Sequence, residues 1–173
     1  RHDRLAKLKE LHAQALEFGF YPGVKLVRGA YMEKERARAL EMSYPSPIQP
    51  DKNATDRDYN AALTFMMEHI DRFSICAGSH NESSAALLIQ LMEEKKIPKN
   101  DQRVYFSQLL GMSDHISFNL SHAGYNVAKY VPYGPVKDVL PYLIRRADEN
   151  TSVAGQTSRE LSLLNKERTR RKK

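Results

Sequence analysis

The chain has 173 residues, of which 41% are hydrophobic and 28% are charged, as is typical of one folded globular domain. No apolar run approaches the ~18 residues that a membrane-spanning helix needs, and the single Cys76 excludes an internal disulfide. The histidines show no ligand spacing with each other or with Cys76, so we expect no metal site.

The net charge of +6 is concentrated at the C-terminal end. Between Arg159 and Lys173, seven Lys or Arg residues stand against two Glu residues, so this segment carries five of the six net charges. No aromatic residue lies among these charges, whereas a protein that binds single-stranded nucleic acid uses aromatic side chains to stack on the bases. We therefore predict a solvated basic helix or tail over 156–173, with weak attraction to an anionic membrane surface as an alternative.

The chain begins at Arg1 and shows no signal or transit peptide. We expect either a processed protein or a piece of a longer one, whose targeting information lies outside this sequence. Residues 1–155 are expected to form one domain that precedes the basic tail.

Hydrophobic periodicity and Gly or Pro breaks predict the elements in chain order. They are a helix over 3–18, a strand over 24–27, a charged helix over 33–43, a loop over 44–53, a helix over 56–71, a strand over 72–77, a helix over 82–95 and a strand over 103–109. Residues 116–121 are either helical or irregular. A strand over 127–131, a long helix to about residue 150 and a basic helix from about 158 follow. Alternating strands and helices predict a parallel sheet with crossover helices.

Pro141 lies inside the predicted long helix, where it lacks an N–H and clashes with the carbonyl of Lys137. We expect either a short turn followed by a helix that starts at Pro141, or a kink there.

Each predicted strand runs into polar or glycine-rich residues, and in parallel α/β folds ligands bind at that edge of the sheet. Lys25, Val27, Gly29 and Tyr31 lie on one side of the first strand if its extended geometry persists. A cation in that row can stabilise developing negative charge, although Lys25 could equally be a solvated edge residue.

His80 stands between Ser79 and Asn81, which suggests a hydrolytic site. Such a site requires a nucleophile on a strained turn and an acidic partner. The sequence shows neither, so we do not expect a hydrolase.

Tyr142, Arg145, Arg146 and Glu149 share one helix face, since they follow an i, i+3, i+4, i+7 spacing. Two guanidiniums can grip a carboxylate, a nearby carboxylate can orient them, and the ring can shelter an apolar body. The face therefore suits a small zwitterionic or acidic ligand. Taken alone, however, the pattern favours a solvated surface helix with an Arg–Glu pair.

Five motifs in this order closely resemble proline dehydrogenase, a family of flavoenzymes, over about residues 20–155. They are Lys25-Leu26-Val27-Arg28-Gly29-Ala30-Tyr31, Ser79-His80-Asn81, Gln108-Leu109-Leu110-Gly111-Met112, Lys129-Tyr130-Val131-Pro132-Tyr133-Gly134-Pro135 and Tyr142-Leu143-Ile144-Arg145-Arg146-x-x-Glu149-Asn150. The sequence resembles the mitochondrial, eukaryotic type more than the bacterial bifunctional one. The resemblance implies that this α/β chain is the C-terminal half, about strands five to eight, of a distorted (β/α)8 barrel.

The same resemblance implies residue roles. Lys25 would lie under the flavin of FAD, at a position where bacterial relatives have Arg. The other cofactor-binding residues would be Val27, Arg28, Gly29, Ala30, Tyr31, Ser79, His80 and Asn81. Leu109, Tyr130 and Tyr142 would surround the ring of L-proline, and Arg145 and Arg146, oriented by Glu149, would bind its carboxylate.

The implied reaction is FAD-dependent oxidation of L-proline to 1-pyrroline-5-carboxylate, with electrons passed to a quinone. It would take place in the mitochondrion, on the matrix side of the inner membrane, with a possible peripheral membrane contact and no nucleic-acid partner. Hydroxyproline dehydrogenases are similar but carry a small residue at the position of Tyr130, so we favour proline as the substrate.

A complete barrel typically needs ~250 residues, and the family's N-terminal half supplies a Lys and an Asp that cannot be assigned here. We therefore expect the chain alone to be weakly stable and inactive. The alternative is a non-catalytic scaffold or interaction fragment with the same fold.

Overall fold

The computed structural model describes residues 1–29, 31–152 and 156–171, without the side chains of 145–160 and 163–164. It divides into two compact units, Arg1–Lys129 and Tyr130–Lys173, and each is described by itself. The predicted domain boundary near residue 155 lies outside the described residues.

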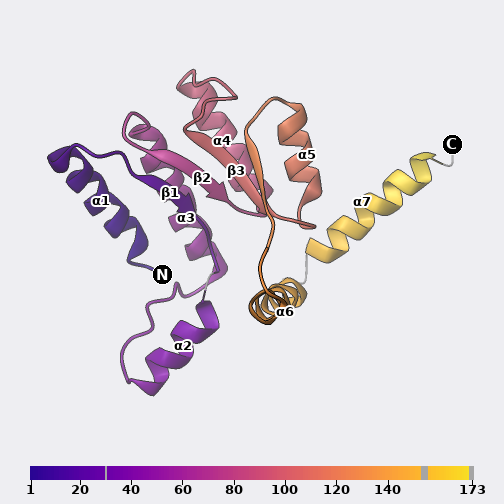
Figure 1. Cartoon of the computed structure of the whole chain (residues 1–173), viewed down its shortest axis with the longest axis horizontal. Coiled ribbons are helices and arrows are strands. Elements are labelled where there is room, and N and C mark those ends of the chain that lie inside the picture. The colour runs from indigo at the N-terminus through magenta and orange to yellow at the C-terminus, as the bar shows by residue number, and fades with distance from the viewer. Residues whose placement is uncertain (30, 153–155, 172–173) are drawn as a thin grey trace. The chain divides into compact units, whose positions relative to one another are not determined.

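A four-stranded sheet in the order β1-β2-β3-β4 forms the centre of the first unit (Figure 1). Its strands are β1 (Gly23–Leu26), β2 (Ser74–Gly78), β3 (Val104–Leu109) and β4 (Val127–Tyr130). The β1–β2 and β2–β3 pairs are parallel, with Lys25 opposite Cys76 and Cys76 opposite Tyr105. The prediction of an α/β fold with a parallel sheet is confirmed.

Helices precede or connect these strands, and most lie within a few residues of the predicted ranges. They are α1 (Arg4–Phe18), α2 (Met32–Glu41), α3 (Lys52–Glu68), α4 (Glu82–Glu94) and α5 (Asp114–His122). Residues 116–121, which the sequence left open, are helical. The predicted start of α3 was four residues late, because Asp51 caps the helix by accepting a hydrogen bond from the Ala54 N–H at 2.6 Å.

The hydrophobic core lies between the helices and one face of the sheet. Figure 1 shows α3 and α4 running along the sheet, with α1 beside α3. The strands contribute alternate residues such as Ile75 and Phe106, and the helices contribute residues such as Leu63, Met66 and Leu88. The opposite face carries Lys25, Cys76 and Tyr105, because side chains alternate along a strand.

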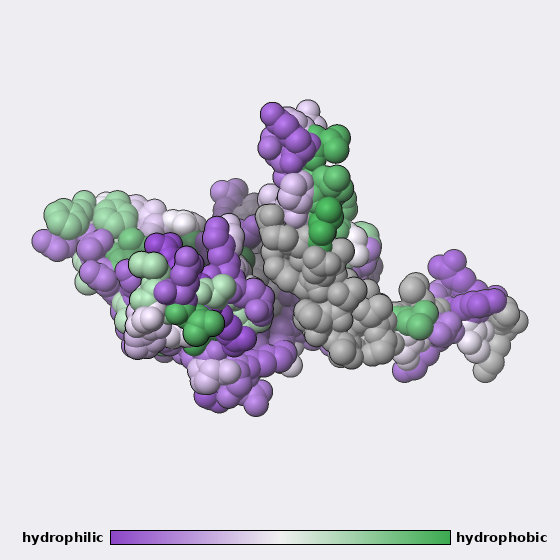
Figure 2. All heavy atoms as spheres, turned by 90° about the horizontal axis from the view of Figure 1, so that it is seen from below, coloured by the Kyte–Doolittle hydropathy of each residue, from purple (hydrophilic) through white to green (hydrophobic). Residues whose placement is uncertain are grey.

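The second unit contains α6 (Val136–Ser152) and α7 (Gln156–Arg171). Helix α6 begins before Pro141 and continues through it, so a helix starting at Pro141 is wrong. Figure 2 shows an apolar strip along its first turns. The strip contains the half-exposed or exposed Val136, Leu140, Leu143 and Ile144, whose spacing places them on one face.

None of the helices in the described part of the chain is long and apolar enough to span a membrane.

Candidate functional site

The carboxyl ends of β1, β2 and β3 bring three predicted motifs to one edge of the sheet. Lys25 lies in β1, whereas Arg28, Ser79 and Leu109 stand at or just beyond strand ends. The parallel pairing explains why segments far apart in sequence meet here.

Lys25 and Val27 lie on one side of the first strand, as predicted, and this side faces away from the helices. A Cβ built on Gly78 would lie 2.9 Å from Val27 Cγ1 and 3.5 Å from Lys25 Cε, so both side chains extend over this glycine. The extended geometry does not persist to Gly29 and Tyr31, whose φ angles are +78° and +58°. Tyr31 instead precedes α2 as its N-cap residue and is largely exposed.

Arg28 is turned toward α3 and α4. Its guanidinium pairs with Asp56, stacks on the Tyr59 ring at 3.9 Å, and donates from Nη2 to Ser79 Oγ at 2.8 Å and to Ser84 Oγ at 2.7 Å. The Arg28 side chain is 15% exposed. Asp56 and Tyr59 share a face of α3 because they are three residues apart.

The Tyr59 hydroxyl is buried beside this guanidinium. Tyr59 is only 4% exposed, and within the described residues its hydroxyl has no hydrogen-bond partner. Burial raises the pKa of Tyr59 to about 12, against the opposing effects of Arg28 and Ser79. The hydroxyl therefore stays protonated at neutral pH and can donate a hydrogen bond.

The loop after β2 is tied to its neighbours through polar side chains. Ser79 Oγ accepts a hydrogen bond from the Asn81 N–H at 3.0 Å, and Asn81 caps α4 by accepting from the Ser84 N–H at 3.1 Å. His80 Nδ1 lies 3.0 Å from Ser113 Oγ. Gln108 Nε2 donates to the Ser79 carbonyl oxygen at 3.1 Å. These contacts fix the three predicted loop residues in place.

The loop after β3 is held by Lys129. Its ammonium lies 2.7 Å from Asp114 Oδ1 and 2.8 Å from the Met112 carbonyl oxygen, and its contact with the Leu109 carbonyl oxygen is longer, at 3.4 Å. Lys129 therefore positions the backbone of Leu109, the predicted substrate neighbour on this strand.

Tyr130 and Tyr142, both predicted to contact the substrate, lie together in the second unit. Their ring centroids are 5.9 Å apart and the planes meet at 62°, an edge-to-face arrangement. Ala30 lies outside the described residues. The side chains of Arg145, Arg146 and Glu149 also lie outside them, although α6 contains all three.

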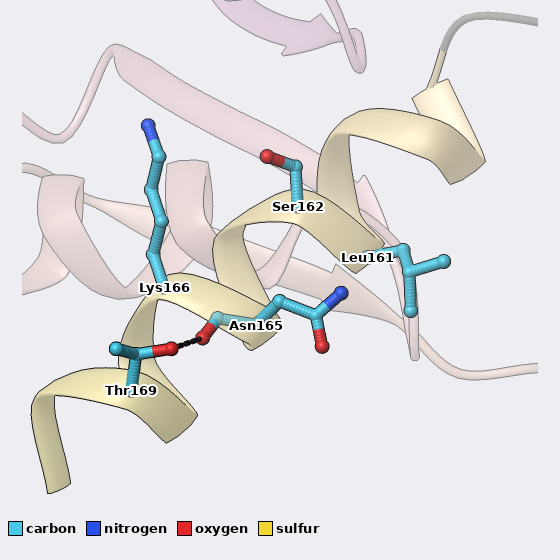
Figure 3. A pocket seen from close by; sticks show the side chains of 5 residues that line it. All are labelled: Leu161, Ser162, Asn165, Lys166 and Thr169. Atoms are coloured by element: carbon cyan, nitrogen blue, oxygen red, sulfur yellow. Dashed lines mark hydrogen bonds between the residues drawn. The ribbon is translucent and has the colours of Figure 1, made fainter. Parts of the chain in front are cut away.

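Other features of the described residues provide no site. They contain no group of three His, Cys, Asp or Glu residues that could hold a metal ion. A shallow hollow on α7 is lined by Leu161, Ser162, Asn165, Lys166 and Thr169 (Figure 3). All five come from one helix, and the Thr169 hydroxyl donates to the Asn165 carbonyl oxygen at 2.8 Å, so the hollow encloses no ligand.

The residues that hold Arg28 and Ser79 in place were not predicted from the sequence. Asp56, Tyr59 and Ser84 surround Arg28, and Gln108 bridges β3 to Ser79. The sequence did contain one signal for Asp56 and Tyr59 of α3. An acidic and an aromatic residue three positions apart lie on one helix face and can together hold a cation.

The proline dehydrogenase family model matches residues 1–159 of this chain. Among curated proteins, the chain is 50% identical over 149 residues to human mitochondrial proline dehydrogenase 1, and this match covers 84% of the chain and 25% of the human protein. It is 46% identical to human hydroxyproline dehydrogenase, over 92% of the chain and 35% of that protein. The chain thus spans between a quarter and about a third of these relatives.

Solved structures of proline utilization A proteins also superpose on this chain. Proline utilization A from Bdellovibrio bacteriovorus, inactivated by N-propargylglycine, superposes with a TM-score of 0.81 at 30% identity. That match covers 87% of this chain and 16% of the other. A bifunctional proline utilization A protein superposes with a TM-score of 0.75 at 26% identity, over 88% of this chain and 15% of the other.

Proposed function

Because this chain belongs to the proline dehydrogenase family, we propose that it is part of an enzyme that oxidises L-proline to 1-pyrroline-5-carboxylate with FAD. The observation that carries the proposal is the arrangement at the carboxyl ends of the parallel strands β1 and β2, where Arg28 donates a hydrogen bond to Ser79 and Lys25 lies on the sheet face beside Gly78. The five motifs that resemble the family lie at this edge or in the second unit.

The donors at this edge fit a dinucleotide cofactor. The buried Tyr59 hydroxyl has no partner in the described part of the chain, and Ser79 and the first turn of α4 stand beside it. Hydroxyl donors and a helix N-terminus suit phosphate oxygens. Nothing in the described residues lies within 4 Å of a Cβ built on Gly29, so a flat ring system has room there. We assign the FAD site to Val27, Gly29, Ala30, Tyr31, Ser79, His80 and Asn81, together with Arg28, which donates a hydrogen bond to Ser79.

FAD, when bound, accepts the hydride from the proline ring carbon next to nitrogen. The work of the protein is to orient the substrate and to stabilise negative charge. We assign the second task to Lys25, whose long side chain reaches along the sheet face toward Gly78 at the end of β2.

Proline has an apolar ring, one carboxylate and one amine. Its binding site should therefore combine apolar side chains that exclude water with a cation that pairs with the carboxylate. The edge-to-face pair of Tyr130 and Tyr142 supplies aromatic surface, and Leu109 supplies aliphatic surface. Arg145 and Arg146 are proposed to bind the carboxylate, with Glu149 orienting them.

Hydroxyproline is the second candidate substrate, because hydroxyproline dehydrogenases of Xenopus laevis and human match this chain at 47% and 46% identity. Proline is favoured because the bulky Tyr130 ring would crowd a 4-hydroxyl group. A third candidate is a non-catalytic scaffold with the same fold.

The proposed enzyme needs more sequence than these 173 residues. We propose that they form strands five to eight of a (β/α)8 barrel and that an N-terminal half supplies the remaining strands, a Lys and an Asp. The protein that contains both halves is called the full-length enzyme below. We place it in the mitochondrion, on the matrix side of the inner membrane, with a quinone as electron acceptor and the basic α7 as a candidate peripheral membrane contact.

A dye-linked proline oxidation assay on the full-length enzyme, with the flavin spectrum recorded, tests the proposal. Replacement of Arg145 or Arg146 by Met should raise KM for proline at least tenfold, because a charged carboxylate partner is lost. Lys166→Met, which removes a cation from the exposed face of α7, is the matched control. Absence of both flavin and proline oxidation would favour the scaffold instead.

A further inference from the structure

Two serines, Ser79 and Ser84, accept hydrogen bonds from the same nitrogen of Arg28. They differ in the acceptor to which each hydroxyl donates its own hydrogen. Ser84 Oγ accepts from Arg28 Nη2 at 2.7 Å and donates to Asn60 Oδ1 at 2.7 Å. Ser79 Oγ accepts twice, from Arg28 Nη2 at 2.8 Å and from the Asn81 N–H at 3.0 Å. A hydroxyl oxygen with two incoming donors can only donate in turn, so the Ser79 hydrogen is left to donate either to the adjacent Tyr59 hydroxyl oxygen or to a ligand.

Arg28 itself is poorly placed to bind an anion directly. Its charge is neutralised by Asp56, its plane is covered by the Tyr59 ring, and both Nη2 hydrogens point to serine hydroxyls. Burial raises the pKa of the Asp56 carboxyl, but hydrogen bonds from Lys52 and Arg28 outweigh it and hold the pKa below its ordinary value. Asp56 is therefore ionised at neutral pH and keeps the guanidinium in place.

We propose that Arg28 is a positioning residue, held by Asp56 and Tyr59 of α3, and that it acts through Ser79, whose hydroxyl donates to a phosphate oxygen of the bound FAD. This inference rests on the proposed function. A donor that receives a hydrogen bond from a cation is polarised and becomes a stronger donor. The adjoining N-terminus of α4, a helix of 13 residues, favours an anionic acceptor over a neutral one.

The proposal makes Arg28 and Ser79 one functional unit, so the effects of their substitutions on the Kd of FAD should not multiply. Ser79→Ala removes the donor, and Arg28→Lys removes the fork that orients it. Each single variant should weaken FAD binding about tenfold, and the double variant should bind FAD no more weakly than Ser79→Ala. Asp56→Asn should weaken binding in the wild-type background and add nothing in the Ser79→Ala background.

The measurement is the Kd of FAD for the apo form of the full-length enzyme, followed by quenching of flavin fluorescence. Ser79→Thr keeps a hydroxyl and should restore affinity to within about threefold of wild type. Ser83→Ala removes an exposed hydroxyl of the same helix and should leave Kd unchanged. Circular dichroism of each apo variant reports separately on folding.

Effects of Arg28→Lys and Ser79→Ala that multiply would show that Arg28 contacts FAD directly, and would overturn the proposal. Equal losses for Ser79→Thr and Ser79→Ala, or no loss for either, would overturn it as well. Wild-type enzyme that binds no FAD would instead contradict the proposed function, so the two failures are distinguishable.

Discussion

Single residues at the sheet edge are constrained by their neighbours more than by their own propensities. Gly78 ends β2 where the chain after β1 passes closest, and a Cβ there would lie 3.1 Å from the Leu26 carbonyl oxygen. That atom belongs to the backbone and cannot rotate away. The glycine therefore lets β1 and β2 approach closely beneath Lys25 and Val27.

Gly78→Ala should lower the stability of the full-length enzyme by about 1–3 kcal/mol, because the strands must separate to admit the methyl group. Gly23→Ala is the matched control, since nothing among the described residues lies within 4 Å of a Cβ at that strand position. Urea unfolding measures both variants. Equal stability of the two would show that the contact at Gly78 is easily relaxed.

Tyr130 determines the substrate preference that we propose. Its ring is 43% exposed and stands edge-to-face with Tyr142. Tyr130→Ser in the full-length enzyme should increase kcat/KM for hydroxyproline relative to proline, because space for the 4-hydroxyl opens. Tyr133→Ser, which removes an almost fully exposed ring nearby in sequence, should leave the ratio unchanged. An unchanged ratio in Tyr130→Ser would remove the reason for preferring proline.

At the scale of elements, the pairing of α1 with α3 depends on stacked rings. His12 of α1 lies with its ring centroid 4.1 Å from that of His69 and 5.6 Å from that of Phe73. Burial, then the charges of His69 and Arg72, lower the pKa of His12, while Asp71 opposes them. Neutral His12 is therefore the form that packs against α3.

A lowered pKa in the folded state means that the stabilisation is complete above about pH 6.5 and is lost as the pH falls through the folded pKa. Amide hydrogen exchange, expressed as protection factors, should show α1 losing protection as the pH decreases in that range. His12→Phe keeps the ring stack and should abolish the pH dependence. His2→Gln, an exposed histidine ahead of the same helix, should retain it; persistence of the effect in His12→Phe would assign it to another group.

The elements were largely predictable because periodicity and Gly or Pro breaks are local signals. The start of α3 was missed because a single cap, Asp51, outweighed the nearby prolines. The Arg28 network could not be predicted, since it joins the residues after β1 and β2 to side chains of α3 and α4, and only the parallel pairing brings these segments together. Motif resemblance identified Arg28 and Ser79, whereas the contact between them required the fold.

At the scale of the whole molecule, the main feature is that helices of the first unit cover only one face of its sheet. Helices cover one face, and the other carries Val27 and Tyr105, which are 49% and 39% exposed. Parallel sheets are generally covered on both faces. Among the described strands β1 is the last in the sheet, so a further strand can pair with its outer edge. These observations support the proposed N-terminal half, which would supply that strand and close the barrel.

The isolated chain should therefore unfold at low urea concentration and show no proline oxidation. A separately expressed N-terminal half, mixed with it before refolding, should raise the unfolding midpoint by closing the barrel. Circular dichroism during urea titration measures this. A midpoint that is high and independent of the added half would show that these residues form a self-sufficient domain.

The most direct test of the proposed function is reduction of the flavin by substrate in the full-length enzyme. Enzyme-bound FAD is mixed with L-proline without oxygen, and its visible absorbance is followed through a single turnover. Proposed proline dehydrogenase chemistry predicts rapid loss of the oxidised flavin spectrum and formation of one equivalent of 1-pyrroline-5-carboxylate. A flavin that stays oxidised with L-proline would contradict it.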